Sequence, residues 1–146
     1  MNFDVSARTI LLVNHGSHAY GTNIATSDRD VKGVCIPPRE YFLGYSHRFE
    51  QSEQMANKGH DCDKVVFNIT KFFKLAADSN PNIIEVLNVD SSDILIMNEF
   101  GEQLRDLRHE FLSKKARFTF SGYATSQLKR IKLHRRWLFD PPKSQP

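Results

Sequence analysis

Apolar runs long enough to cross a bilayer, which takes about 20 residues, are missing from this chain of 146 residues. It has only two cysteines, Cys35 and Cys62, which form neither a metal-binding pattern nor a disulfide framework. Both lie in apolar, strand-like runs, so we expect buried thiols. The N-terminus lacks the basic region and the small-residue cleavage site of a secretory signal. These absences argue against a membrane-spanning or secreted protein and favour a cytoplasmic one.

Acidic residues are missing between residues 111 and 139. Residues 1–110 carry 11 Lys and Arg against 16 Asp and Glu, whereas residues 111–146 carry 9 against a single acid, Asp140. Clustered positive charge is typical of a surface that meets phosphate groups, so residues 114–136 could bind RNA. A solvated helix face that balances the acidic part of the chain explains the charge equally well.

The length and patterning predict one domain over residues 1–139, with 140–146 as a tail or linker. Apolar runs bounded by Gly or Pro predict strands at 9–15, 28–38, 61–67 and 93–97. Helical periodicity predicts helices at 68–80, with Asn68 as N-cap, at 101–112 and at 123–138. The polar segment 50–60 reads as a mobile loop, and 82–89 as a short helix or a strand. The pattern is that of a mixed α and β protein, with strands early and helices late.

Asp28 and Asp30 open the second expected strand, which reads DRDVKGVCIPP. Side chains two residues apart on a strand point to one face, about 6.6–7 Å apart along the chain. Two carboxylates on one face repel each other unless a cation lies between them. Mg²⁺ is commonly held by one or two carboxylates together with substrate phosphates, so the pair predicts a metal site. A polar turn at a solvent-facing strand end is the alternative.

A glycine-serine pair, Gly16-Ser17, directly follows the first expected strand. Glycine lets the backbone approach a ligand closely, and the N–H groups of such a turn can face phosphate oxygens. An ordinary tight turn would also use glycine. The order of strand, Gly-Ser turn, connector and strand with two Asp residues can nevertheless hold a triphosphate on one side and its metal on the other. Phosphoryl or nucleotidyl transfer needs that layout.

The stretches GSHAYGT (16–22) and SDRDVKGV (27–34) resemble the Gly-Ser…Asp-x-Asp motif of the DNA polymerase β-like nucleotidyltransferase superfamily. They are similar in particular to the nucleotidyltransferases associated with RNA-repair ligases in bacteria and phages. Residues 63–87 and 120–138 resemble later parts of the same family. The resemblance therefore covers most of the chain.

This resemblance implies an α+β nucleotidyltransferase fold, in which helices pack on a small mixed sheet and a basic helix closes the chain. It implies that Gly16 and Ser17 hold the phosphates of an NTP, and that Asp28 and Asp30 bind Mg²⁺ or Mn²⁺ and take part in catalysis. Arg29 stands between them where the family more often has an apolar or aromatic residue. By strand alternation it points away from the metal.

The superfamily also uses a third carboxylate on a neighbouring strand. Asp61 and Asp63 share one strand face by alternation. The resemblance favours Asp63, with Asp61 as the alternative. Its role would be to bind the catalytic metal and to accept the proton of an attacking hydroxyl.

Further candidates are weaker. Lys32 shares the strand face of the two Asp residues and could contact a phosphate, or be an ordinary surface lysine. Tyr20 could stack on a base, although a packed turn aromatic is the favoured interpretation. Arg130 and His134 share a stripe of the last helix and could bind triphosphate or RNA phosphates. Glu85 either lines the site or fastens the end of its helix, and the second is favoured.

The sequence thus predicts a metal-dependent nucleotidyltransferase that moves an NMP from an NTP to an acceptor hydroxyl of RNA, protein or a small molecule. The rival hypothesis is a non-catalytic module that keeps this fold and binds nucleic acid or a protein, as a regulator or antitoxin would. A third, weaker hypothesis is a host-interaction protein whose basic helix docks on an acidic surface. Family members usually extend further than Pro146, so the chain is a compact version or a fragment.

Overall fold

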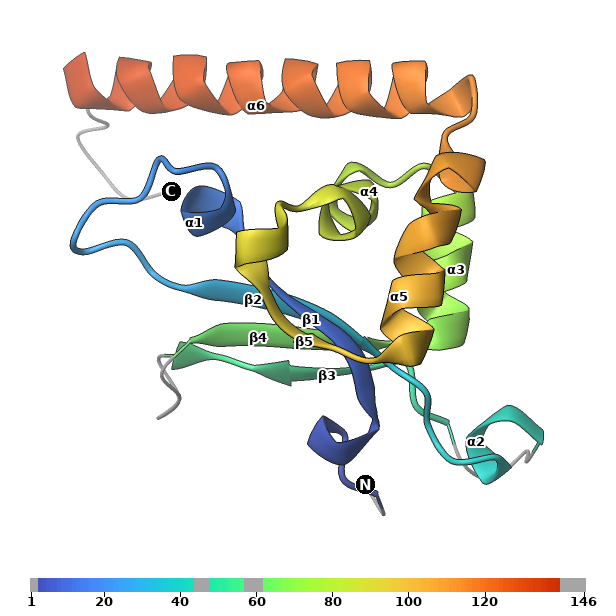
Figure 1. Cartoon of the computed structure of the whole chain (residues 1–146). Coiled ribbons are helices and arrows are strands. Elements are labelled where there is room, and N and C mark those ends of the chain that lie inside the picture. The colour runs from blue at the N-terminus through green and yellow to red at the C-terminus, as the bar shows by residue number, and fades with distance from the viewer. Residues whose placement is uncertain (1–2, 44–47, 57–61, 140–146) are drawn as a thin grey trace.

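A five-stranded mixed sheet forms the centre of the protein (Figure 1). The structure is a computed structural model that describes residues 3–43, 48–56 and 62–139. The sheet has the order β3-β4-β2-β1-β5. Strands β2 and β4 pair in parallel, while the β1–β2, β1–β5 and β3–β4 pairs are antiparallel. The strands are β1 (Thr9–His15), β2 (Asp30–Cys35), β3 (Gln51–Gln54), β4 (Asp63–Asn68) and β5 (Ile94–Met97).

Helices cover mainly one face of this sheet, whereas η1 and α2 lie beyond the other face (Figure 1). Helix α6 lies farthest from the sheet and contacts α4. The helices are α1 (Gly16–Ala19), α2 (Glu40–Leu43), α3 (Ile69–Ala77), α4 (Pro81–Asn88), α5 (Glu99–Asp106) and α6 (Lys115–Phe139). The described part of the chain also contains the short 3₁₀ helices η1 (Ser6–Arg8), η3 (Ser91–Asp93) and η4 (Leu107–Phe111). The expected α+β architecture is confirmed.

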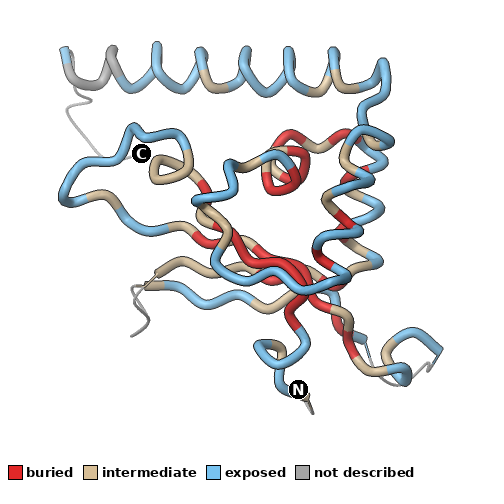
Figure 2. The backbone as a smooth tube through the Cα atoms, in the orientation of Figure 1, coloured by how far each residue is buried: buried red, intermediate tan, exposed pale blue. Residues whose placement is uncertain are grey.

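The core lies between the sheet and the helices α3, α4 and α5. Alternation along β1 directs Leu11 and Val13 into this core, where they join Phe72 and Leu87. Residues of the opposite strand faces, including Leu12, form a smaller cluster on the far side of the sheet. Figure 2 shows the buried residues along the central strands and α4. Polar side chains on the face of the sheet that the helices cover are therefore shielded from solvent.

Local signals account for the helix boundaries near the site. The Asn68 side chain accepts a hydrogen bond of 2.8 Å from Thr70 N, so the predicted N-cap of α3 is confirmed. Asn80 caps α4 in the same way, and Pro81 occupies the first turn, where its missing N–H costs nothing. Residues 82–89, which the sequence left open between helix and strand, are therefore helical over most of their length.

Several boundary predictions are wrong. Segment 50–60 was expected to be a loop, yet Gln51–Gln54 form strand β3, because β4 offers an open edge for pairing. Strand β2 begins at Asp30 and ends at Cys35, so it is shorter at both ends than expected. Helix α6 begins at Lys115, well before the expected start. The expected tail, 140–146, lies outside the described residues.

Exposure also differs from expectation. The apolar residues that give α6 its helical period are not buried, since Leu128 is 57% and Ile131 62% exposed. Cys35 is buried, whereas Cys62 is only half-buried, and both thiols are free. Among the described helices, none is long and apolar enough to cross a membrane.

Candidate functional site

Gly16 and Asp30 lie against each other in the candidate site. Strand β1 ends at His15, and Gly16 opens α1 with a φ of +64°. A Cβ at Gly16 would lie 2.5 Å from Asp30 Oδ2. Glycine is therefore required here for two reasons, because the backbone is left-handed and a carboxylate occupies the side-chain position. The two motifs found in the sequence meet at this point.

Strand register brings Asp63 beside Asp30. In the parallel β2–β4 pair Asp30 is the partner of Asp63, and in the antiparallel β1–β2 pair it is the partner of His15. Paired residues of neighbouring strands lie about 4.8 Å apart and point to the same face. Asp63 Oδ1 also accepts a hydrogen bond of 2.7 Å from Ala56 N, which ties the carboxylate to the end of β3. The sequence alternative, Asp61, lies outside the described residues.

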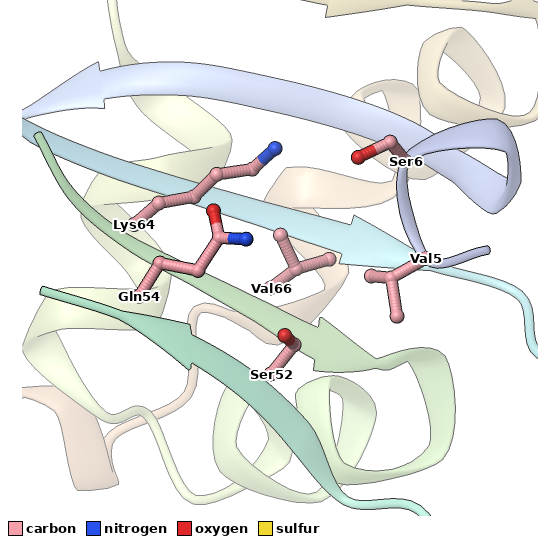
Figure 3. Close-up of a pocket in the computed structure, with 6 residues that line it drawn as sticks. All are labelled: Val5, Ser6, Ser52, Gln54, Lys64 and Val66. Atoms are coloured by element: carbon pink, nitrogen blue, oxygen red, sulfur yellow. The ribbon is translucent and has the colours of Figure 1, made fainter. Parts of the chain in front are cut away.

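A cavity of ≈160 Å³ opens beside these two carboxylates. Its polar lining consists of Asp30, Lys32, Glu53, Gln54 and Asp63. On the opposite face of the sheet, the cavity between η1 and the strands measures only ≈20 Å³, which is room for about one water molecule (Figure 3). Of these two cavities, the one on the helix side is the larger, and it carries the carboxylates that could bind a metal ion.

Asp28 is less well defined by the fold than the sequence suggested. It is exposed and precedes β2, so the alternation expected between Asp28 and Asp30 does not apply to it. Arg29 donates hydrogen bonds of 3.2 and 3.1 Å to Asn14 Oδ1. Because Asn14 alternates with His15 along β1, Arg29 lies on the face away from Asp30, as expected.

Asp30 and Asp63 are the side chains of this arrangement that could bind a metal ion. Within the described residues, no group of three or more His, Cys, Asp or Glu side chains is close enough together to hold a metal ion. Asp30 and Asp63 provide adjacent hard oxygen ligands, which suit Mg²⁺. A site with two protein carboxylates fits this ion where substrate phosphates and water complete the coordination.

His15, Lys32 and Glu85 form a polar cluster next to Asp30. The ring of His15, which is 7% exposed, places Nε2 3.3 Å from Glu85 Oε2 and 3.4 Å from Lys32 Nζ. An ammonium only donates hydrogen bonds and a carboxylate only accepts them, so Nε2 can satisfy one partner at a time. Burial, followed by the charge of Lys32, lowers the pKa of His15, while Glu85 acts in the opposite direction. Burial also lowers the pKa of Lys32.

Tyr20 and Glu85 line a second cavity, of ≈230 Å³, between α1 and α4. The Glu85 carboxylate lies near the Tyr20 hydroxyl, and burial, followed by this neighbour, raises the pKa of Tyr20. The residue as a whole is 57% exposed, so it is not the packed turn aromatic that was favoured. Glu85 lies within α4, lines this cavity and pairs with His15, which agrees with the less favoured expectation, that it lines the site.

The two candidates on α6 lie apart from these contacts. Arg130 and His134 are exposed. Helical spacing puts them on the same side of α6 as Tyr123, whose hydroxyl interacts electrostatically with Tyr20. Ser17 is half-buried in the first turn of α1. The side chain of the N-cap residue, His15, makes no capping hydrogen bond to that turn.

One site residue was missed in the sequence. His15 ends a continuous apolar run and was treated as part of a buried strand. Its position directly before Gly16 was the available signal, because a polar ring at that position must find partners in the site or the core.

The sheet is small and mixed, its glycine turn packs against one aspartate, and the adjacent parallel strand carries a second aspartate. This arrangement is that of a nucleotidyltransferase-type fold. The profile of the family described as "RlaP: RNA repair pathway DNA polymerase beta family" matches residues 2–137. The chain belongs to this family, and the resemblance seen in the sequence is confirmed.

Similar proteins come from distant organisms. The chain is 28% identical over 130 residues to an uncharacterized 38.9 kDa protein of Enterobacteria phage T4, covering 82% of this chain and 38% of that protein. It is 29% identical over 116 residues to an uncharacterized protein of Methanocaldococcus jannaschii, with 79% and 46% covered. It is 31% identical over 112 residues to the uncharacterized protein YcgL of Bacillus subtilis, with 75% and 41% covered. The chain thus spans less than half the length of each relative, and no solved structure gives a significant match.

Proposed function

We propose that the protein is a metal-dependent nucleotidyltransferase that moves an NMP from an NTP to an acceptor hydroxyl and releases pyrophosphate. The observation that carries this proposal is the position of the Asp30 carboxylate, which lies against Gly16 and beside its parallel partner Asp63. Membership of a DNA polymerase β family supports it. The acceptor belongs to RNA, a protein or a small molecule, and the repair context of the family favours RNA.

The phosphates of the NTP would bind at the glycine turn. The N–H groups in the first turn of a helix have no partner within the helix, and in α1 the side chain of the N-cap residue His15 does not cap them. Gly16 and Ser17 would therefore hold the β- and γ-phosphates, and Lys32 would add a positive charge from the neighbouring strand. Tyr20 would contact the nucleoside.

The metal and the acceptor would bind at the two paired carboxylates. Asp30 and Asp63 would hold Mg²⁺ or Mn²⁺, which supplies charge neutralisation for the phosphates when bound. Asp28, which is not close enough in this structure to form a three-residue metal site with them, would approach the ion from the segment before β2. The acceptor oxygen forms a bond to the α-phosphorus, and the bond between this phosphorus and the β-phosphate oxygen breaks. Asp63 accepts the proton of the hydroxyl, and the electron pair of the broken bond leaves with pyrophosphate.

The basic helix would serve the acceptor or the triphosphate. Residues 114–136 are free of acids, and exposed cations such as Arg130 are available to phosphate groups. His134, on the same side of α6, would contribute to this surface. A cytoplasmic location, where NTPs and RNA are present together, belongs to the same proposal.

Label transfer tests the proposal. The purified protein is incubated with Mg²⁺ or Mn²⁺ and each α-³²P NTP, in the presence of total RNA or of a protein extract. We expect label on one class of acceptor with the wild type, and none with Asp30→Asn or Asp63→Asn. Asp106→Asn, a matched change at an exposed position of α5, should retain full transfer.

The alternative function gives a different result. A protein that binds Mg²⁺ and NTP but transfers no label from any donor would be the non-catalytic binding module. Transfer that persists in both Asp variants would place the chemistry elsewhere and overturn the proposed site.

A further inference from the structure

The cavity between α1 and α4 has an unusual chemical lining. Its polar side chains are those of His15, Tyr20, Glu85, Asn88 and Asp90, and its volume is ≈230 Å³. Complete small-molecule sites typically measure about 300–1,000 Å³. The cavity therefore suits one part of a ligand whose remainder lies outside it.

Each donor group of this lining already has an acceptor nearby within the protein. The hydroxyl of Tyr20 lies near the Glu85 carboxylate, and Asn88 Nδ2 donates one of its two N–H groups to the carbonyl of Ile84 at 2.8 Å. Nδ2 is thereby held at the backbone, which leaves Asn88 Oδ1 as the acceptor of that side chain. A ligand in the cavity thus meets mainly acceptors.

Asp90 adds a further hydrogen-bond acceptor to the cavity. Its Oδ1 accepts hydrogen bonds from Ser92 N at 2.9 Å and Ser92 Oγ at 2.7 Å, so that Oδ2 is available to a ligand. The same bonds lower the pKa of Asp90, and its carboxylate is charged at neutral pH. Two carboxylates, those of Glu85 and Asp90, repel phosphate groups. The cavity consequently suits the part of a nucleotide that donates hydrogen bonds.

We propose that this cavity binds the base of the donor nucleotide and selects guanine, an inference that rests on the proposed nucleotidyl transfer. Guanine carries two adjacent donors, N1–H and the N2 amino group, on one edge. Uracil has one N–H between two carbonyl oxygens, which the carboxylates repel. Adenine and cytosine each place an amino group beside a ring nitrogen that accepts.

Position supports the same ligand. Ala19 and Tyr20 line the cavity and directly follow the turn that starts at Gly16, so a triphosphate on that turn leaves its nucleoside near the cavity. The ring of Tyr20, in a residue 57% exposed, offers a face on which a base can stack.

Equilibrium binding of nucleotides to the wild-type protein with Mg²⁺ tests this inference by calorimetry. We expect GTP to bind at least tenfold more tightly than UTP, because a well-made set of base contacts discriminates by on the order of tenfold to a hundredfold. ITP, which lacks the N2 amino group, should bind roughly tenfold more weakly than GTP, and 2′-deoxyGTP should bind like GTP.

Asp90→Asn provides the decisive variant. Asparagine keeps Oδ1 and with it the cap on Ser92, but it replaces the open acceptor by a donor. The GTP-to-UTP preference should fall about tenfold with an unchanged melting temperature. Asp93→Asn, in the same short helix η3 but outside the cavity lining, should leave the preference unchanged.

The results separate this inference from the proposed function. Equal binding of all four NTPs, or a preference that survives Asp90→Asn, overturns guanine selection even where label transfer proceeds. A loss of affinity for 2′-deoxyGTP without any base preference also overturns it, since the cavity would then read the ribose. A guanine preference without label transfer would support guanine binding in the cavity and reject nucleotidyl transfer. No binding of any NTP would reject both.

Discussion

Replacing Gly16 by alanine tests whether the Asp30 carboxylate has to lie against the turn. The φ of +64° costs a residue with a Cβ about 1–2 kcal/mol. The new Cβ would lie 2.5 Å from Asp30 Oδ2, whereas real Cβ atoms essentially never approach below 3.0 Å, and 3.4 Å begins ordinary contact. The carboxylate must therefore move by roughly 0.5–0.9 Å. A misplacement of about 1 Å can cost on the order of 100-fold in rate, so we expect transfer to fall tenfold to a hundredfold.

Gly21→Ala is the matched control. Gly21 has the same φ of +64°, but nothing lies within 4 Å of an added Cβ. The positive φ should cost both variants about 1–2 kcal/mol of unfolding free energy, and Gly16→Ala should lose more because its Cβ also meets Asp30. Each kcal/mol lowers the melting temperature by about 2–4 °C for a chain of this size. Transfer of α-³²P label should fall only in Gly16→Ala. Equal transfer rates in the two variants would refute the argument that Gly16 positions Asp30.

Three further predictions concern stability and thiol chemistry. Because burial lowers the folded-state pKa of His15, the unfolded chain binds the proton first, and the wild type should lose stability relative to His15→Gln as the pH falls below 6.5. Urea unfolding at several pH values measures this, and parallel pH profiles would contradict it. Asn68→Ala removes the cap at Thr70 N and should cost about 1–2 kcal/mol in urea unfolding, whereas an unchanged midpoint would show that the cap is dispensable. Half-buried Cys62 should react with a thiol reagent well before Cys35, whose pKa burial raises to about 11; peptide mass spectrometry distinguishes this from equal labelling.

The parts of the fold that depend on local pattern could be predicted from the sequence. A continuous apolar run predicts β1, and Asn68 before a helical period predicts the start of α3. Strand β3 could not be predicted, because Gln51–Gln54 have no apolar alternation and become a strand only by pairing with the edge of β4. For α6 the helical period is visible, but burial depends on what packs against it, and Leu128 and Ile131 are exposed.

The candidate site could likewise be predicted only in part from the sequence. Motif order predicts Gly16 and Asp30, and the structure brings them into contact. Asp30 and Asp63 are neighbours because of the register between two strands that are distant in the chain, and no local pattern specifies this register. The pairing of His15 with Glu85 likewise depends on how α4 packs over the sheet. Such contacts between distant segments are the part of a site that a single sequence leaves open.

The fate of two labels in one donor tests the central claim most directly. The same NTP is supplied with ³²P at the α- or at the γ-position, together with the acceptor identified by label transfer. Nucleotidyl transfer predicts that α-label moves to the acceptor while γ-label appears in pyrophosphate, and that Asp63→Asn abolishes both. Transfer of γ-label to the acceptor, or α-label transfer that survives Asp63→Asn, would contradict the account.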